Sequence, residues 1–473
     1  MILAIDLGTT HWKAALITDS GEISRVSRIP TPVVFEDGFP CYAAEAVKQH
    51  LRELLANLGP LPPLSAVALT GMAEAGLLVE RGTLRPLSSV WPWFDRRALP
   101  VFESTRGDFR FADRPAVTGL PDSYKYGIYK LLTLMKTGKY DPDRTAWMGL
   151  VSYAAGLLTG ACAEDVSLAA RTGCLDIHTL RWDEGFLNAI GLRAGMFPRL
   201  IRPGEEAGMV SGPGWGIPRG TPVCIGGHDH LCAAYGMGAS DQVFLSAGTA
   251  QVLLGPAWRT ETGTGLSYGP TPGAAPYACL GSIQSAGGSV NYWKRLLYSV
   301  ADYEDMMQEA DTAPVGSGLL WFPYLSGSGA PHLNPDAGGG LIGLRDGTDR
   351  GAIIAAVYEG LAFETRYLAE AMRIPDGAAV YCSGGLTLHR RYMRTLANVL
   401  KRPVLLPVYE ETALYGAARL ALCRLGLPGL PDAPVRERLE PDPAESATLE
   451  RVYLERYLPM MRLVTKPHAP SGR

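Results

Sequence analysis

The beginning of the chain alternates between short apolar runs and turn residues. Residues 2–5 and 12–18 are apolar runs typical of strands, and the turn at 6–10 between them holds an acid, a glycine and two threonines. We expect the two runs to pair as a hairpin. Apolar positions then recur at helical spacing over 43–58, and residues 64–70 form the short apolar run of a buried strand.

The same design returns in the middle of the chain. Residues 223–225 predict a strand, and 231–237 predict a helix of small apolar residues. A second strand pair is expected over 243–254, again with a glycine–threonine turn at its tip, residues 246–249. Because each half would begin its sheet in this way, we expect two domains, residues 1–239 and 240–473.

Helices and strands alternate through the remaining sequence. In the first half, helices are expected over 125–137 and 151–158, and the Pro- and Gly-rich stretch 198–223 predicts a winding connection. The second half predicts helices over 351–372, 389–400 and 415–425, strands over 380–382 and 404–406, and a closing helix over 445–458 that Pro459 stops. This alternation indicates an α/β fold.

Composition narrows the function classes. The chain has 473 residues, and 47% of them are apolar. A chain of this length is too long for one ordinary hydrophobic core, so we expect two domains. The net charge of -3 gives no electrostatic pull toward nucleic acid or a membrane, and no apolar run approaches the ~18 residues of a membrane span. Asp6 stands where a signal peptide needs apolar residues, and the eight cysteines form no C-x-x-C pair. We therefore expect a cytoplasmic protein with reduced thiols.

The turn after the first strand carries the residue types of a phosphate site. Gly8 lets backbone amides approach an anion, and Thr9 and Thr10 add hydroxyl donors. Asp6, at the strand end, could hold Mg²⁺ directly or through water, and Lys13 on the next strand could reach a phosphate oxygen. The turn matches neither of the common phosphate-loop motifs. A tight hairpin turn with a solvated acid is the alternative interpretation.

Asp229 is the candidate catalytic base. It lies on an open turn after two glycines, where its carboxylate could accept a hydroxyl proton and orient the oxygen toward a γ-phosphate. Transition-metal binding by His228, Asp229 and His230 is the rival interpretation, but consecutive ligands on a short turn are strained and no distant ligand pair completes a site. Each histidine could also simply bond to the backbone of the turn.

Two further glycine turns lie in the second half. Gly248 would allow close approach to a phosphate, and Thr249 could donate a hydrogen bond to it. Gly384 and Gly385 lie between a predicted strand and a predicted helix, where glycines permit contact with a flat ring or a phosphate. A plain strand-to-helix turn explains the second pair equally well.

Polar and aromatic residues of the first half could hold a polyhydroxy ligand. Glu74, Trp93, Asp95 and Arg97 follow strand-like segments. Carboxylates accept hydrogen bonds from hydroxyl groups, and aromatic faces pack against the C–H surface of such ligands. A tryptophan that only caps the core is the structural alternative, because Trp91 lies close by.

These segments occur in an order that resembles the FGGY carbohydrate kinases. The turn 6–10 is similar to the first phosphate motif of that family, 93–97 to its W-x-D-x-R loop, 164–167 to its S-D-x-S segment, and 227–229 to the segment with its catalytic aspartate. Residues 246–249 resemble its second phosphate turn, 321–335 a long family signature, and 384–385 with 412–418 its adenosine region. The resemblance extends from the N-terminus to about residue 425.

The resemblance implies an actin-like ATPase fold of two ribonuclease H-like domains with a central cleft. It also implies ATP and Mg²⁺ as cofactors and transfer of the γ-phosphoryl group to an alcohol, with Asp229 as the base and Asp6 holding the Mg²⁺. The nucleotide would contact Gly8, Thr9, Thr10, Lys13, Gly248, Thr249, Gly384 and Gly385. The substrate would contact Glu74, Trp93, Asp95 and Asp229.

Departures from the family pattern leave the substrate open. Near Glu74, xylulokinases usually carry a Met-His-Gly pattern and glycerol kinases an Arg-Glu pair, and Ala73 here replaces both the His and the Arg. We expect a kinase of a small ketose such as a pentulose, with a polyol kinase of the glycerol or erythritol type as the alternative. A non-catalytic sensor of sugar or nucleotide is a second alternative. The expected partner is a small sugar or polyol, and a homodimer is left open.

Overall fold

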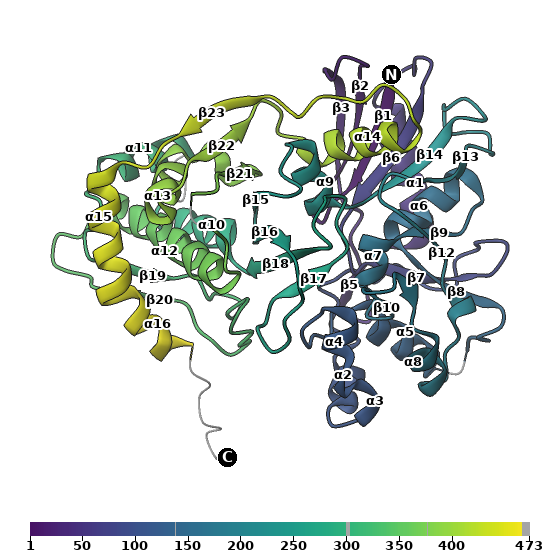
Figure 1. Ribbon diagram of the computed structural model, residues 1–473, viewed down its shortest axis with the longest axis horizontal. Helices are drawn as coiled ribbons and strands as arrows, with labels where there is room; N and C mark the ends of the chain where they lie inside the picture. The colour runs from purple at the N-terminus through teal and green to yellow at the C-terminus, as the bar shows by residue number, and fades with distance from the viewer. Residues whose placement is uncertain (138, 299–302, 376, 466–473) are drawn as a thin grey trace.

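Two mixed sheets organise the chain (Figure 1). The computed structural model describes residues 1–137, 139–298, 303–375 and 377–465. The first sheet has six strands in the order β13-β14-β6-β1-β2-β3. Their bounds are β1 (Ile2–Leu7), β2 (His11–Ile17), β3 (Ile23–Pro30), β6 (Ala66–Gly71), β13 (Glu206–Met209) and β14 (Pro222–His228).

The first sheet brings distant chemistry-bearing residues to one edge. β1 pairs antiparallel with β2, as the hairpin pattern predicted, and parallel with β6, which in turn is parallel to β14. In this register Asp6 lies opposite Thr70, and Thr70 lies opposite Gly227. Since the carboxyl ends of parallel strands meet at the same edge, Asp6 and the turn that leads into Asp229 become neighbours.

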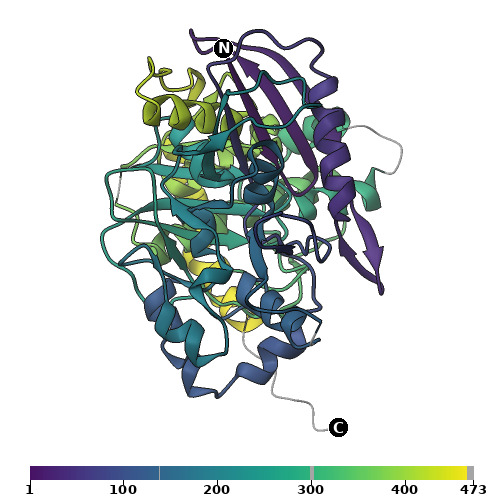
Figure 2. The ribbon, with the colours of Figure 1, turned by 90° about the vertical axis from the view of Figure 1, so that its right-hand side faces the viewer.

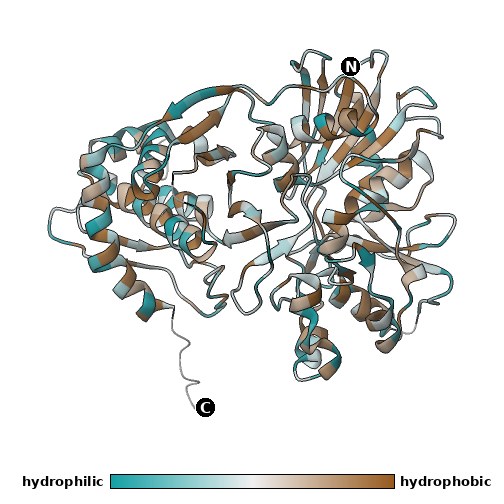
Figure 3. Cartoon of the chain, in the orientation of Figure 1, coloured by the Kyte–Doolittle hydropathy of each residue, from teal (hydrophilic) through white to brown (hydrophobic). Residues whose placement is uncertain are grey.

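Helices cover both faces of the first sheet, which explains why β1 is apolar at nearly every position. Leu3 and Ile5 point to the face covered by α1 (Ala44–Ala56) and α6 (Leu150–Thr159), while Ile2 and Ala4 point to the face covered by α9 (Asp229–Gly236) and α14 (Thr412–Arg424). A strand buried on both faces reads as a continuous apolar run. Figure 3 shows this concentration of hydrophobic residues in the strands and the inner helix faces.

Helix α14 comes from the second half of the sequence but packs on the first sheet. It contacts α9 and the strands β1, β6 and β14 (Figure 1). Small residues allow this approach: a Cβ on Gly416 would lie 1.7 Å from the carbonyl oxygen of Cys232, so only glycine fits there. The chain therefore returns to its first sheet after building the second one.

The second sheet repeats the opening of the first. Its seven strands run in the order β17-β18-β16-β15-β21-β22-β23, and β15 pairs antiparallel with β16 and parallel with β21, as β1 does with β2 and β6. The strand bounds are β15 (Val243–Ala247), β16 (Gln251–Ala257), β17 (Ser267–Gly269), β18 (Tyr277–Ile283), β21 (Val380–Ser383), β22 (Val404–Pro407) and β23 (Val435–Leu439). The core beside it contains the long helix α12 (Arg350–Ala371) and α13 (Arg390–Leu400).

Smaller elements surround the two sheets (Figures 1 and 2). In the first half these are β4 (Val34–Glu36), β5 (Phe39–Cys41), β7 (Gly76–Glu80), β8 (Thr145–Gly149), β9 (Ala163–Asp165), β10 (Leu175–Asp176), β11 (Arg181–Trp182), β12 (Arg199–Ile201), α2 (Leu99–Thr105), α3 (Phe109–Ala112), α4 (Arg114–Thr118), α5 (Gly127–Met135), α7 (Val166–Ala170), α8 (Glu184–Ala189) and the 3₁₀ turn Ala194–Met196. In the second half they are α10 (Ala286–Leu297), α11 (Tyr303–Thr312), β19 (Leu320–Phe322), β20 (Gly340–Ile342), the 3₁₀ turn Gly385–Leu388, α15 (Pro443–Val452), the π-helical turn Tyr453–Tyr457 and α16 (Leu458–Val464).

Two local predictions were wrong. The stretch 198–223 is not merely a connection, because it forms β12 and the edge strand β13. Pro459 does not stop the closing helix: α15 passes through the π-helical turn into α16, where Pro459 occupies the first turn. The turn before the proline is π-helical, with the N–H of Leu458 donating to the carbonyl oxygen of Tyr453, so the regular helical hydrogen-bond pattern already changes beside a residue that has no N–H to donate. Within the described ranges, no helix is long and apolar enough to cross a membrane.

Candidate active site

Asp6 is a buried carboxylate with an oxygen that has no partner. It is the second-to-last residue of β1, it is 9% exposed, and its Oδ1 makes no hydrogen bond within the described part of the chain. Burial and the charge of Asp229 raise its pKa to about 7, although Lys13 works in the opposite direction. A buried carboxylate oxygen without a donor is costly unless a cation or a proton satisfies it, so Asp6 suits a bound metal ion.

Asp229 is the first residue of α9, at the edge of the first sheet where Asp6 also lies near the carboxyl end of β1. Its Oδ1 accepts a hydrogen bond from the backbone N–H of His230 at 2.7 Å, and its side chain is 22% exposed. Burial and the charge of Glu74 raise its pKa to about 7, against the effect of that hydrogen bond. A carboxylate with such a pKa is poised to take up a proton near neutral pH.

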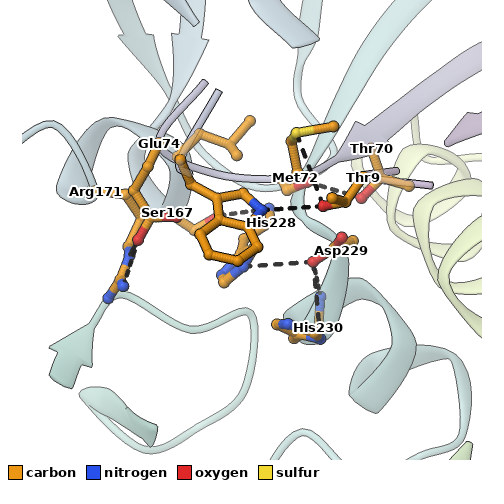
Figure 4. Close-up of polar contacts among 12 residues, drawn as sticks. Thr9, Thr70, Met72, Glu74, Ser167, Arg171, His228, Asp229 and His230 are labelled. Atoms are coloured by element: carbon orange, nitrogen blue, oxygen red, sulfur yellow. Dashed lines mark hydrogen bonds and ion pairs between the residues drawn. The ribbon is translucent and has the colours of Figure 1, made fainter. Parts of the chain in front are cut away.

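The histidines beside Asp229 are neutral neighbours. The Nε2 of His228 lies 3.4 Å and the Nδ1 of His230 3.8 Å from Asp229 Oδ1 (Figure 4). Burial lowers the pKa of His228 well below its usual range and that of His230 to about 4. At neutral pH they therefore offer neutral donors or acceptors to a ligand beside the base.

Glu74 is held in place from two sides. Its backbone has φ +58°, a conformation unusual for a residue other than glycine. The Nζ of Lys130 donates to its carbonyl oxygen, and Arg171 donates to its Oε1 through Nε at 2.8 Å and Nη2 at 2.5 Å. The Nζ of Lys125 lies 3.8 Å from the same oxygen. Burial opposes ionisation, but Arg171 and Lys125 outweigh it and lower the pKa of Glu74 to about 2, so the carboxylate stays charged.

The first turn is tied to the aromatic loop and to α14. Trp93 donates from Nε1 to the Oγ1 of Thr9 at 3.1 Å, so two residues 84 positions apart in the sequence meet here. A Cβ on Gly8 would lie 2.9 Å from the carbonyl oxygen of His11, so the turn is tight. Lys13 pairs with Glu411, the residue before α14, at 2.5 Å. Thr10 is exposed at the tip of the turn.

Asp95 differs from the other candidate residues because its carboxylate is buried and paired with an arginine. It is fully buried, and Arg97 binds its carboxylate with Nε at 3.0 Å and Nη2 at 2.7 Å. The guanidinium of Arg97 also stacks 4.0 Å from the ring centre of Trp91. In this arrangement the Asp95 carboxylate supports the loop that carries Trp93, and a contact with substrate stays a prediction.

The second turn lies at the start of α10. The N–H groups of Gly287 and Gly288 donate to the carbonyl oxygens of Gly248 and Thr249, each at 3.1 Å. Gly384 also reaches this turn: it has φ +104°, and a Cβ there would lie 2.7 Å from the carbonyl oxygen of Ala247. Gly385 has open space around its Cα. These glycines leave room for a ligand beside the turn.

The structure thus links Asp229 to Asp6 and to Glu74 through charge effects, and it links Thr9 to Trp93 through a hydrogen bond. Among the described residues, no hydrogen bond or ion pair links Asp229 to the second turn, and the nucleotide roles of both turns stay predictions. Sequence reasoning missed Arg171 and Lys125. No motif marks them, because an arginine after a short helix and a lysine in a loop are ordinary surface residues until the fold sets them against Glu74.

Comparison with known proteins identifies the family. Residues 1–236 match the N-terminal domain and residues 243–425 the C-terminal domain of the FGGY family of carbohydrate kinases. The chain belongs to this family. It is 30% identical over 476 residues to the glycerol kinase of Thermus brockianus, covering 93% of each chain, and 28% identical over 457 residues to that of Alkalilimnicola ehrlichii, covering 90% of this chain and 91% of the other.

Solved structures of FGGY kinases have the same fold. The xylulose kinase of Lactobacillus acidophilus superposes with a TM-score of 0.88 at 22% identity, covering 98% of both chains. The glycerol kinase of Plasmodium falciparum, solved with ADP, gives a TM-score of 0.85 at 20% identity, covering 97% of both chains. The expected actin-like ATPase fold is confirmed.

Family membership makes this protein an ATP-dependent phosphotransferase that acts on an alcohol group, with ATP and Mg²⁺ as cofactors. The residues present fit the ion: Asp6 offers a buried carboxylate oxygen without a donor and would hold Mg²⁺ directly or through water. When bound, Mg²⁺ supplies positive charge that neutralises the phosphates.

Proposed function

We propose that this FGGY kinase phosphorylates a hydroxyl of a small ketose such as a pentulose, with Asp229 as the general base. The observation that carries the proposal is the placement of Asp229 at the edge of the first sheet, mostly buried and with a pKa raised to about 7. The substrate hydroxyl gives its proton to Asp229 as its oxygen attacks the γ-phosphorus of ATP. The bond from that phosphorus to the β–γ bridging oxygen breaks, and ADP leaves with its electron pair.

The surroundings of Glu74 support a polyhydroxy substrate with a carbonyl group. Arg171 and Lys125 both approach Oε1 of Glu74, which leaves Oε2 to accept a hydrogen bond from a substrate hydroxyl. Lys125 is 30% exposed, and its 3.8 Å contact is longer than a hydrogen bond, so its ammonium can donate to a ketose oxygen. Glu74 also raises the pKa of Asp229, which supports a short distance between this group and the base.

A polyol such as glycerol is the second candidate. Two named relatives are glycerol kinases, and the family resemblance gives those enzymes an Arg-Glu pair at this point of the sequence. Ala73 takes the place of that arginine, but Arg171 supplies a guanidinium to Glu74 from the end of α7. An arginine–glutamate pair is thus present, with the arginine supplied from the end of α7 and not by the residue next to Glu74, and this favours polyol binding.

The deciding experiment measures ADP formation with a panel of ketoses and polyols, including D-xylulose and glycerol. Asp229→Asn should lower the rate of phosphorylation about 10²- to 10⁴-fold while the variant still binds ATP. Asp108→Asn is the matched control, because Asp108 caps the short helix α3 and makes no contact with the site, and its rate should equal that of the unchanged protein. An unchanged rate in Asp229→Asn would refute the assigned base. Nucleotide binding with no phosphorylated product from any compound would instead favour the sensor interpretation.

A further inference from the structure

We propose that Thr70 and Ser167 form a buried clamp that positions Asp229, by fixing both ends of the peptide group between Gly227 and His228. The inference rests on the proposed function, in which Asp229 is the base. The Oγ1 of Thr70 donates to the carbonyl oxygen of Gly227 at 2.8 Å. The N–H of the same peptide group, on His228, donates to the Oγ of Ser167 at 3.0 Å (Figure 4).

The clamp holds the chain at a β-bulge, where the regular pairing of β14 with β6 is interrupted. Along the pairing of β14 with β6, Ile225 is opposite Leu69 and Gly227 is opposite Thr70, so Gly226 is an extra residue in a bulge. A bulge interrupts the ladder of backbone hydrogen bonds and turns the strand, and such bulges occur beside active sites. The two side-chain hydroxyls therefore hold a backbone segment that the sheet itself holds only weakly.

Ser167 has a fixed orientation. Its Oγ and its backbone N–H both donate to Oδ1 of Asp165, which caps α7, and the N–H bond measures 2.8 Å. Asp165 is fully buried, and Ser167 is 3% exposed. Because the hydroxyl proton points to Asp165, a lone pair of Oγ faces the N–H of His228. The acid is therefore a part of the clamp, although it does not touch the turn directly.

Glycine is the only residue type that fits at position 227, beside Ser167 and Asp165. Gly227 has φ +116°, and a Cβ would lie 2.6 Å from Oγ of Ser167 and 2.7 Å from Oδ1 of Asp165. With its peptide group held at both ends, the chain enters α9 at His228 in one direction, and Asp229 becomes the first helical residue. A displacement of about 1 Å at a reacting group can cost about a hundredfold in rate, so this rigidity matters for a base.

Thr70→Val tests the clamp, because valine keeps the shape of threonine and lacks the donor. The acceptor is D-xylulose or glycerol, whichever the full-length protein phosphorylates faster. We expect kcat to fall about ten- to hundredfold while the acceptor KM stays within about twofold, the pattern of an interaction made in the transition state. Thr70→Ser keeps the hydroxyl and should restore most of the rate. Thr118→Val is the matched control: it removes a buried hydroxyl from the same half of the chain, bonded to Arg114, and should leave kcat unchanged.

A second measurement separates positioning from a purely structural role. If the clamp acts through Asp229, Thr70→Val should reduce the residual rate of Asp229→Asn little further, whereas independent effects would multiply. Multiplying losses, or a Thr70→Val rate equal to that of Thr118→Val, would overturn the clamp while leaving Asp229 as the base. Full activity in Asp229→Asn would instead overturn the proposed function itself.

Discussion

The substitution Asp229→Asn should stabilise the protein at alkaline pH although it removes most of the activity. Folding raises the pKa of Asp229 from 3.8 to about 7, so the folded state holds its proton more tightly than the unfolded state. Between those two values the folded state binds more protons, and stability falls as the pH rises. At 1.36 kcal/mol per pKa unit, this shift costs the folded state about 4 kcal/mol at pH 8, where the carboxylate is ionised, and only about 2 kcal/mol at pH 5, where it is protonated. Asparagine removes that cost and keeps an oxygen for the N–H of His230.

The expected gain of Asp229→Asn is therefore about 2–3 kcal/mol larger at pH 8 than at pH 5. For a domain the size of residues 1–236, this corresponds to a difference of about 5–10 °C in Tm. The assay is calorimetric unfolding of both proteins between pH 5 and pH 8, without nucleotide or Mg²⁺. Bound Mg²⁺ supplies a counter-charge and should shrink the difference, because it also neutralises Asp6.

Asp95→Asn is the opposing control for this measurement. Its carboxylate is fully buried but paired with Arg97, and breaking a buried ion pair destabilises by about 3–5 kcal/mol. One buried Asp→Asn change should thus stabilise and the other destabilise at pH 8. A gain for Asp229→Asn that is absent at pH 8, or that does not change with pH, would refute the reasoning about its buried charge.

Three further predictions concern the site. The acid limb of the pH profile of kcat/KM for the acceptor should lie near pH 7, because Asp229 must be ionised to act as a base. Glu74→Gln should move this acid limb to lower pH, because the charge of Glu74 raises the pKa of Asp229. Lys13→Met should raise the KM for ATP, whereas Glu411→Gln, which releases Lys13 from its ion pair, should lower or preserve it in steady-state assays. Gly227→Ala should lower the free energy of unfolding by about 1–3 kcal/mol or more in denaturant titrations, because φ +116° strains an alanine.

Local patterns in the sequence were enough to predict the two hairpins and their turns. The runs 2–5 and 12–18 became β1 and β2, and the run 243–254 became β15 and β16. Such predictions succeed because strand burial and turn chemistry depend on neighbours a few residues away. The same reasoning failed at Pro459, where a π-helical turn and α16 follow instead of a helix end.

The candidate site was predictable only in part. Asp6 and Asp229 follow apolar runs, so their place at strand ends could be expected, and parallel pairing through β6 then makes them neighbours. Asp95 shows the limit of this reasoning: its sequence context is that of a ligand-binding loop, but its carboxylate is buried against Arg97. The sequence does not reveal whether a polar residue after a strand faces a ligand or a neighbouring side chain.

The sequence by itself determined the α/β character, the paired glycine–threonine turns and the position of the acid at 229 along the chain. Only the tertiary structure decided which distant groups surround that acid. Arg171 reaches Glu74 across 97 residues, and Thr70 reaches Gly227 across 157. These contacts depend on sheet register, on the bulge at Gly226 and on the return of α14 to the first sheet. Each follows from packing of the whole chain, because the free energy that fixes such pairs comes from burial shared by segments far apart in sequence.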